Sequence, residues 1–209
     1  MNIVVENYTK VIRGKTVLSN VNLKLTSGSV YGLSGKNGSG KTMLLRALAG
    51  LILPTCGFVM IDKKKLGKDI QFPPSVGVLI ETPVFIGKYS GLKNLELLAS
   101  INNEVDREEI SQTLTDVGLD PCNKKPFSKY SLGMRQRLGL ACAMMGKPDL
   151  VLLDEPFNAM DAEGVQLAQK IILKSKLNGA LVLLACHDLQ QLGNLCDGIY
   201  TLADGRVLV

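Results

Sequence analysis

Short runs of Val, Ile and Leu alternate along the chain with longer segments in which apolar residues recur every three or four positions. The short runs predict buried strands and the longer segments predict amphipathic helices, an order typical of an α/β domain with a largely parallel sheet. Strands are expected at residues 30–34, 76–80, 150–153, 180–185 and 199–202. Helices are expected at residues 42–50, 131–145, 161–177 and 189–195.

Two parts of the chain depart from this alternation. Residues 3–5, 21–25 and 58–61 predict strands, with no helix between the first two, and so indicate an antiparallel layer beside the main sheet. From residue 82 to residue 130 the apolar positions repeat only at helical spacing. We therefore predict a catalytic core made of residues 1–81 and 131–209, interrupted by a helical subdomain at residues 82–130.

The composition narrows the class of protein. With 209 residues, 46% of them hydrophobic and 21% charged, the chain can bury a large core, which excludes intrinsic disorder of the whole. Its apolar runs are shorter than the roughly 20 residues of a membrane span, and its first residues lack a secretory pattern, so we expect a cytoplasmic protein. Five scattered cysteines and a single histidine fit a reducing compartment and argue against a zinc site. The net charge of +5 is too modest to indicate nucleic acid, and none is expected as a partner.

A glycine-rich turn follows the expected strand at residues 30–34 and opens the next helix. Its sequence, GKNGSGKT, matches the phosphate-loop pattern G-x-x-x-x-G-K-T. Glycines let successive amides point inward toward an anion, the lysine reaches the β and γ phosphates, and the threonine hydroxyl binds Mg²⁺. The predicted triphosphate-binding residues are Gly35, Lys36, Asn37, Gly38, Ser39, Gly40, Lys41, Thr42 and Met43.

Three further polar residues come directly after buried strands. Asp154 and Glu155 end the run at residues 150–153, and His187 follows the run at residues 180–185. Ligands of open α/β sheets bind at the carboxyl ends of the strands, so these side chains are expected beside Lys41. Asp154 is predicted to hold a metal, Glu155 to accept a proton from an attacking water, and His187 to contact the γ phosphate or order that water. The alternatives are a solvated acidic turn and a structural histidine.

The segment YSLGMRQR at residues 130–137 resembles a divergent form of the LSGGQ signature of ABC transporter nucleotide-binding subunits, of which Ser131 and Gly133 match. Its position, after the helical insertion and before Leu-Leu-Asp-Glu-Pro, strengthens the resemblance, which extends over nearly the whole chain. The resemblance implies a RecA-like P-loop NTPase fold and an Mg²⁺-dependent ATPase. It also implies that two subunits pack head to tail, with Ser131 and Gly133 of one facing the ATP of the other and Asp161 in the loop between the sites.

This chain departs from the family pattern at three places. Glu81 stands where the family usually has a glutamine that senses Mg²⁺, and we expect Glu81 to keep that role and to serve as a metal ligand and catalytic residue. Ile12 stands where an aromatic ring often stacks on adenine, which leaves selectivity for ATP over GTP open. Leu132 and Met134 replace the glycine and glutamine of the signature, which leaves the strength of the closed dimer open.

The resemblance also implies a separate membrane subunit, which would hold the chain at the inner face of the membrane. The apolar segment at residues 83–89 is expected to dock that partner through Phe85, the alternative being a loop folded back on its own helices. Similarity to the bacitracin-type export subgroup favours export of an antimicrobial peptide or drug. Whether the ATPase dimer is a homodimer or a heterodimer stays open. A soluble ATP-driven switch acting on ribosomes or nucleic acid is the alternative function, and a small-molecule kinase a third.

Overall fold

The computed structural model describes residues 1–101 and 105–208 of the chain. Residues 102–104, which belong to the predicted helical subdomain, and residue 209 lie outside the described residues. The main sheet has six strands in the order β10-β9-β3-β8-β7-β6. They are β3 (Ser29–Ser34), β6 (Val76–Leu79), β7 (Leu150–Asp154), β8 (Leu181–Ala185), β9 (Gly198–Ala203) and β10 (Arg206–Leu208).

The inner strands of the main sheet run parallel. Strand β3 pairs with β8 and β9, and β7 pairs with β6 and β8, all in parallel. Strands β7 and β8 are buried along their whole length because helices cover both faces, which explains their unbroken apolar sequences. Strand β10 alone pairs antiparallel, through the turn at Asp204 and Gly205, whose φ values of 47° and 75° suit a two-residue hairpin.

A second, antiparallel sheet has the order β2-β1-β4-β5. It consists of β1 (Asn2–Ile12), β2 (Lys15–Thr26), β4 (Cys56–Ile61) and β5 (Lys64–Lys65). The predicted antiparallel layer is therefore present, with β1 and β2 longer than the runs at residues 3–5 and 21–25. Buried and exposed positions alternate along much of β2. Because polar residues occupy the exposed positions, the strand contains no long run of apolar residues and was predicted too short.

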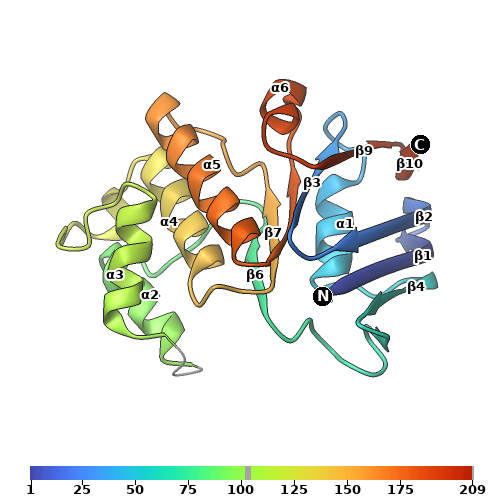
Figure 1. Ribbon diagram of the computed structural model, residues 1–209, viewed down its shortest axis with the longest axis horizontal. Helices are drawn as coiled ribbons and strands as arrows, with labels where there is room; N and C mark the ends of the chain where they lie inside the picture. Colours follow the sequence, from blue (N-terminus) through green and yellow to red (C-terminus); the bar gives the residue numbers. More distant parts are fainter. Residues whose placement is uncertain (102–104, 209) are drawn as a thin grey trace.

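The helices form layers on either side of the main sheet (Figure 1). Helix α1 (Lys41–Leu48) contacts both β2 and the strands β7 and β8, so it lies between the two sheets. Helices α4 (Leu132–Met144) and α5 (Ala162–Leu177) cover the opposite face of the main sheet. The short helix α6 (Leu189–Gly193) follows β8. None of the helices that the structure describes is long and apolar enough to cross a membrane.

The described part of residues 82–130 contains α2 (Gly91–Ala99), α3 (Arg107–Asp116) and a 3-10 turn (Phe127–Lys129), and no strand. Leu95 of α2, Ile110 of α3 and Leu138 of α4 are buried in one cluster that continues onto the main sheet. The helical insertion therefore packs on the core through α4. Its boundaries at residues 82 and 130 stay a prediction.

The loop between β6 and α2 is partly folded back on the helices. The ring of Phe85 is half-buried, with its centroid 5.2 Å from that of Phe127, and the Asn94 side chain accepts a 2.8 Å hydrogen bond from the Ile86 amide. Val84 is 88% exposed and Ile86 is 49% exposed. Phe85 thus packs partly against its own helices, as the alternative anticipated, while Val84 and Ile86 face solvent. That this loop docks the membrane partner stays a prediction.

Candidate active site

The predicted site residues meet at one edge of the main sheet because the strands before them are parallel and in register. Asp154, the last residue of β7, pairs with Ala185 of β8, and Ala185 in turn pairs with Leu33 of β3. The segments that leave these strands are the phosphate loop after β3, Glu155 after β7 and His187 after β8. The sheet thus brings together residues from three distant parts of the sequence, as predicted.

The phosphate loop has a curved backbone that requires glycine. Gly35, Gly38 and Gly40 have φ values of 148°, 81° and 108°, and a Cβ on Gly35 would lie 2.3 Å from the carbonyl oxygen of Leu202. The Lys41 ammonium donates hydrogen bonds to the carbonyl oxygens of Gly35 at 2.6 Å and Lys36 at 3.3 Å. These bonds hold the loop closed around its own lysine.

One buried hydroxyl of this loop is unsatisfied. The Oγ atom of Ser39, a residue only 7% exposed, has no hydrogen-bond partner among the described residues. Leaving a buried polar atom unpaired costs about 1–3 kcal/mol, and such atoms in native proteins generally have a functional partner. An anion in the loop would supply that partner, so the loop chemistry fits a bound phosphate.

A second pair of residues fits a hard cation. The Thr42 hydroxyl donates a 2.6 Å hydrogen bond to Oδ2 of Asp154, a carboxylate that is only 9% exposed. Burial raises the pKa of Asp154, the Thr42 bond opposes that shift, and the negative charge of Glu155 adds to it. The half-buried Thr42 hydroxyl and the buried Asp154 carboxylate form an oxygen donor set suited to Mg²⁺, whose positive charge would stabilise the ionised carboxylate.

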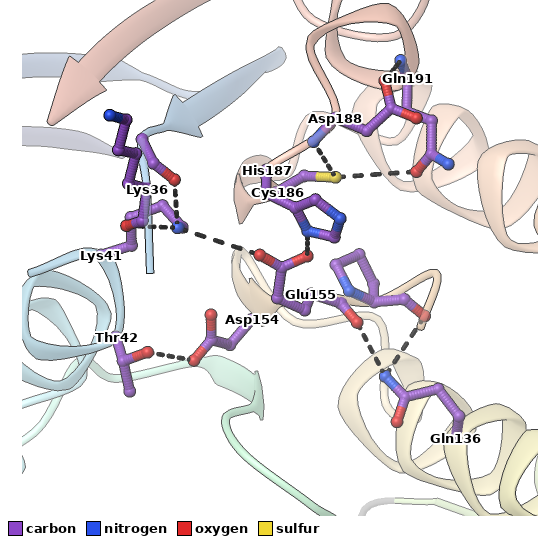
Figure 2. Close-up of polar contacts among 12 residues, drawn as sticks. Lys36, Lys41, Thr42, Gln136, Asp154, Glu155, Cys186, His187, Asp188 and Gln191 are labelled. Carbon is purple, nitrogen blue, oxygen red and sulfur yellow. Dashed lines mark hydrogen bonds and ion pairs between the residues drawn. The ribbon is translucent and has the colours of Figure 1, made fainter. Parts of the chain in front are cut away.

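Glu155 lies at the centre of the site (Figure 2). Its Oε1 is 4.0 Å from Nζ of Lys41, and its Oε2 is 2.9 Å from Nδ1 of His187. The backbone of Glu155 has a φ of 47°, a left-handed conformation that costs a non-glycine residue energy and occurs preferentially at functional sites. Its amide nevertheless donates a 2.9 Å hydrogen bond to the carbonyl of Ala185, which holds the strained residue in place.

A cavity of about 510 Å³ opens beside these residues. Lys41, Thr42, Asp154 and Glu155 line it, together with residues of the β2 strand and the Asp204–Gly205 turn. Ile12 pairs with Lys15, which also borders the cavity, so the position expected to meet a nucleotide base lies at its rim. A larger cavity of about 690 Å³ between α3 and α5 lies elsewhere and is lined by none of the predicted site residues.

Glu81 approaches the same edge from β6 but binds another group. With Asp154 and Glu155 it lines a second cavity of about 430 Å³. Its exposed carboxylate pairs with the guanidinium of Arg46 on α1, and its φ is 63°. The structure thus places Glu81 near the predicted metal ligands while giving it a cationic partner that the sequence analysis did not consider.

The signature residues lie apart from the phosphate loop of their own chain. Ser131 is the N-cap of α4, its Oγ accepting a 3.2 Å hydrogen bond from the Met134 amide, and the following Leu132 is 62% exposed. A Cβ on Gly133 would lie 2.8 Å from the carbonyl oxygen of Ala159, so glycine permits close packing against the loop before α5. Neither Ser131 nor Gly133 lines the 510 Å³ cavity.

Asp161 connects this region to the signature helix. Its carboxylate caps α5 by accepting a 3.0 Å hydrogen bond from the Gly164 amide, and it pairs with the guanidinium of Arg137 on α4. The Gly164 bond and the Arg137 bond lower the pKa of Asp161. Asp161 is thus the N-cap of α5 and also ties that helix to α4.

Comparison with known proteins identifies the family. Residues 18–158 match the ABC transporter family. The chain is 44% identical over 201 residues to the uncharacterized ABC transporter ATP-binding protein YybJ of Bacillus subtilis (strain 168), covering 96% of this chain and 92% of YybJ. The chain is an ABC transporter ATP-binding protein. It is also 37% identical over 205 residues to the bacitracin transport ATP-binding protein BcrA of Enterococcus faecalis, covering 97% of this chain and 67% of BcrA.

Solved structures confirm the predicted fold of this ATP-binding subunit. The dimeric structure of MJ0796, a bacterial ABC transporter cassette, superimposes with a TM-score of 0.89 at 25% identity, covering 99% of this chain and 97% of that one. The expected RecA-like P-loop NTPase core with an antiparallel layer is therefore correct, and the ATP-binding subunit belongs to a family of ATPases.

One buried residue beside the site of the ABC subunit was not predicted from the sequence. Gln136 on α4 is 9% exposed, and its Nε2 donates hydrogen bonds to the carbonyl oxygens of Glu155 at 3.1 Å and Pro156 at 3.3 Å (Figure 2). The helix carrying the signature is thereby tied to the backbone of Glu155. Helical spacing could have revealed this, since Gln136 precedes the buried Gly139, Leu140 and Ala143 on one stripe of α4.

Proposed function

We propose that this ATP-binding subunit hydrolyses ATP at the phosphate loop, with Glu155 as the base that takes a proton from the attacking water. The observation that carries the proposal is the position of the Glu155 carboxylate, 4.0 Å from the Lys41 ammonium and 2.9 Å from the His187 ring. Lys41 would face the β and γ phosphates, so a base beside it is within reach of a water in line with the γ phosphate. His187 would orient that water or contact the γ phosphate.

The remaining predicted residues bind the substrate. The amides of the loop at residues 35–42 and the Ser39 hydroxyl, which has no partner among the described residues, would donate hydrogen bonds to phosphate oxygens. Phosphate oxygens would also replace the carbonyl oxygens that the Lys41 ammonium now contacts. Thr42 and Asp154 would hold Mg²⁺, with Glu81 the proposed third residue of that group. The metal supplies positive charge that offsets the charge on the transferred phosphoryl group.

We further propose that a second ABC cassette completes each site. Ser131 and Gly133 lie at the N-terminus of α4, outside the phosphate-loop cavity of their own chain, and a helix N-terminus favours an anion. In a head-to-tail pair each signature would meet the γ phosphate held by the other subunit. The solved dimeric cassette of the same fold supports this arrangement. An identical copy and a different cassette would both give this geometry.

Trapping the closed pair tests these roles. In the Glu155→Gln variant, hydrolysis should fall by about 10²–10⁴-fold, the usual contribution of a general base, while ATP and Mg²⁺ still bind. The variant should then elute as a dimer on size exclusion with ATP and as a monomer without it. Adding Ser131→Arg should abolish the dimer but spare ATP binding, and Lys41→Ala should abolish both. A Glu155→Gln protein that hydrolyses ATP at the normal rate would overturn the proposal.

The cargo is proposed from the relatives and the surface. BcrA is named for bacitracin transport, and we propose that this subunit powers export of an antimicrobial peptide through a separate membrane protein at the inner face of the membrane. Val84 and Ile86 expose apolar surface on the loop between β6 and α2, and we propose that this surface contacts the membrane partner. The relatives are transport proteins, so nothing favours the alternative of a soluble switch on ribosomes or nucleic acid.

Co-expression tests this part of the function. Cells that produce the subunit together with the membrane protein encoded by the neighbouring gene should resist bacitracin-like peptides. The Lys41→Ala variant should remove this resistance. Val84→Asp should prevent co-purification with the membrane protein but keep ATP binding, whereas Val11→Asp, also at an exposed valine, should not. Equal co-purification of both variants would argue against the docking surface.

A further inference from the structure

Three different metal-ligating groups meet beside the proposed base. One oxygen of Glu155, the Sγ of Cys186 and one ring nitrogen of His187 all lie within 4.8 Å of one another. Figure 2 shows the His187 ring next to both the Glu155 carboxylate and the Cys186 side chain. Cys186 and His187 are consecutive in the segment that leaves β8, and Glu155 directly follows the neighbouring strand β7.

We propose that Glu155, Cys186 and His187 form a binding site for a borderline-soft divalent cation of the zinc class, and that occupation of this site stops ATP hydrolysis. A thiolate, an imidazole and a carboxylate are the ligands that Zn²⁺ selects in proteins, and three protein ligands plus a water complete a tetrahedral shell. Mg²⁺ prefers oxygen ligands, so this site would be distinct from the pair Thr42 and Asp154.

The spacing of the three groups suits such a cation after small movements. Zinc bonds of about 2.0–2.3 Å in a tetrahedron place neighbouring ligand atoms about 3.3–3.7 Å apart. Oε2 of Glu155 and Nδ1 of His187 lie 2.9 Å apart, and the other separations do not exceed 4.8 Å. The His187 side chain is 62% exposed, so its ring is free to shift toward a cation held between the three groups.

The Cys186 thiol has only weak partners to give up. Its sulfur accepts a 3.4 Å contact from the Asp188 amide and lies 3.7 Å from Oε1 of Gln191. Burial raises the pKa of Cys186, so the free site holds a protonated thiol. A bound zinc-class cation deprotonates a coordinating thiol, and the proton passes to solvent. Scattered cysteines and a single histidine gave no sign of this site in the sequence, because its three ligands come together only at the edge of the folded sheet.

The effect on hydrolysis rests on the proposed function, because it follows from Glu155 acting as the base. A carboxylate bound to a cation cannot accept a proton from water, and the imidazole bound beside it cannot orient that water. Since the Cys186 thiol has no part in the proposed hydrolysis, the Cys186→Ser variant should keep the basal ATPase rate while losing the cation.

Cobalt absorption tests the site without any activity measurement. Co²⁺ is titrated into nucleotide-free protein carrying Cys56→Ser and Cys122→Ser, which removes the two exposed thiols. A saturable sulfur-to-cobalt charge-transfer band, with one ion per chain, is expected. Cys186→Ser in that background should abolish the band, and His187→Ala at an exposed side chain should weaken binding by about 10-fold or more. Absence of the band, or its persistence in Cys186→Ser, would overturn the site.

The ATPase assay tests the consequence. With MgATP in excess, Zn²⁺ should inhibit the unsubstituted protein, and Cys186→Ser should raise the half-inhibitory concentration by about 10-fold or more. Equal inhibition of the two proteins would overturn the proposal, because Zn²⁺ would then act elsewhere. If cobalt binding depends on Cys186 but Zn²⁺ leaves hydrolysis unchanged, the inhibition is overturned and only the cation site stands. The base role of Glu155 is decided separately, by the hydrolysis rate of Glu155→Gln.

Discussion

The hydroxyl of Thr42 donates a 2.6 Å hydrogen bond to Oδ2 of Asp154, joining residues that are 112 positions apart in the chain. This bond connects the end of the phosphate loop to the end of β7. It also leaves a buried carboxylate beside two other acids, Glu155 and Glu81, in the nucleotide-free protein. The fold therefore holds three carboxylates close together, and a cation bound there would stabilise them.

Asp154→Asn should make the nucleotide-free protein more stable. The amide oxygen can still accept the Thr42 hydrogen bond, while the buried charge is removed, so the free energy of unfolding should rise by about 1 kcal/mol. The further rise in Tm that Mg²⁺ adds to ATP should disappear. Asp149→Asn, at an exposed residue just before β7, is the control for a lost charge. A lower Tm in nucleotide-free Asp154→Asn would contradict this account.

Glu81→Ala should alter the Mg²⁺ dependence of ATPase activity. Removing a carboxylate from the cavity that it shares with Asp154 should raise the Mg²⁺ concentration required for half-maximal rate by several-fold. Arg46→Ala removes the same ion pair from the other side, so it separates the two roles of Glu81. Arg46→Ala should change stability by less than about 1 kcal/mol and leave the Mg²⁺ requirement unchanged. If both variants behave alike, Glu81 acts only as a partner of Arg46.

Gln136→Leu should destabilise the fold and slow hydrolysis. The substitution leaves the buried carbonyl oxygen of Pro156 without its donor, which costs about 1–3 kcal/mol in the free energy of unfolding. The Glu155 carbonyl loses one of its two donors and keeps the 3.2 Å bond from the Asn158 amide. Denaturation in urea measures this change, and ATPase assays measure the loss of positioning at Glu155. Gln166→Leu, at an exposed position on α5, is the matched control and should be near neutral. Similar results for both glutamines would show that the Gln136 bonds contribute nothing.

Acid should weaken the fold partly through Asp197. Hydrogen bonds from Lys176 and from the Val30 amide lower the pKa of Asp197 below its ordinary value of 3.8. A carboxylate with a lowered pKa contributes stability that is present above 3.8 and is lost as the pH falls toward the folded-state pKa. Asp197→Asn should therefore give a shallower loss of stability in this acid range.

Denaturant unfolding at a series of pH values measures this dependence. Glu163→Gln, at an exposed residue of α5, controls for the loss of one negative charge. An unchanged acid slope in Asp197→Asn would show that other carboxylates account for the acid sensitivity.

The buried strands and the phosphate loop were predicted well because the residues that determine them are adjacent in the sequence. Strands β7 and β8 are buried on both faces and therefore read as unbroken apolar runs, while the charged phosphate loop is specified by its own glycines and lysine. Strands β1 and β2 were predicted too short because each alternates between a buried and an open face.

Contacts between distant elements were less accessible to sequence reasoning. Nothing near Phe85 in the sequence indicates that its ring packs on Phe127, and the pairing of Glu81 with Arg46 depends on where β6 and α1 end in space. The juxtaposition of Glu155, Cys186 and His187 arises in the same way, from strand order in the sheet. Such contacts follow from topology, which residue spacing alone does not determine.

The hydrogen bonds from the Lys41 ammonium to the carbonyl oxygens of Gly35 and Lys36 affect the rate at which ATP associates with the loop. Because the loop is already curved before nucleotide binds, it loses little conformational entropy on binding. The entropic cost to the binding free energy is therefore small. Loading should then be limited by diffusion and by release of these two internal contacts. The rate-limiting step of the ATPase cycle would then be the movement of whole subunits toward and away from each other.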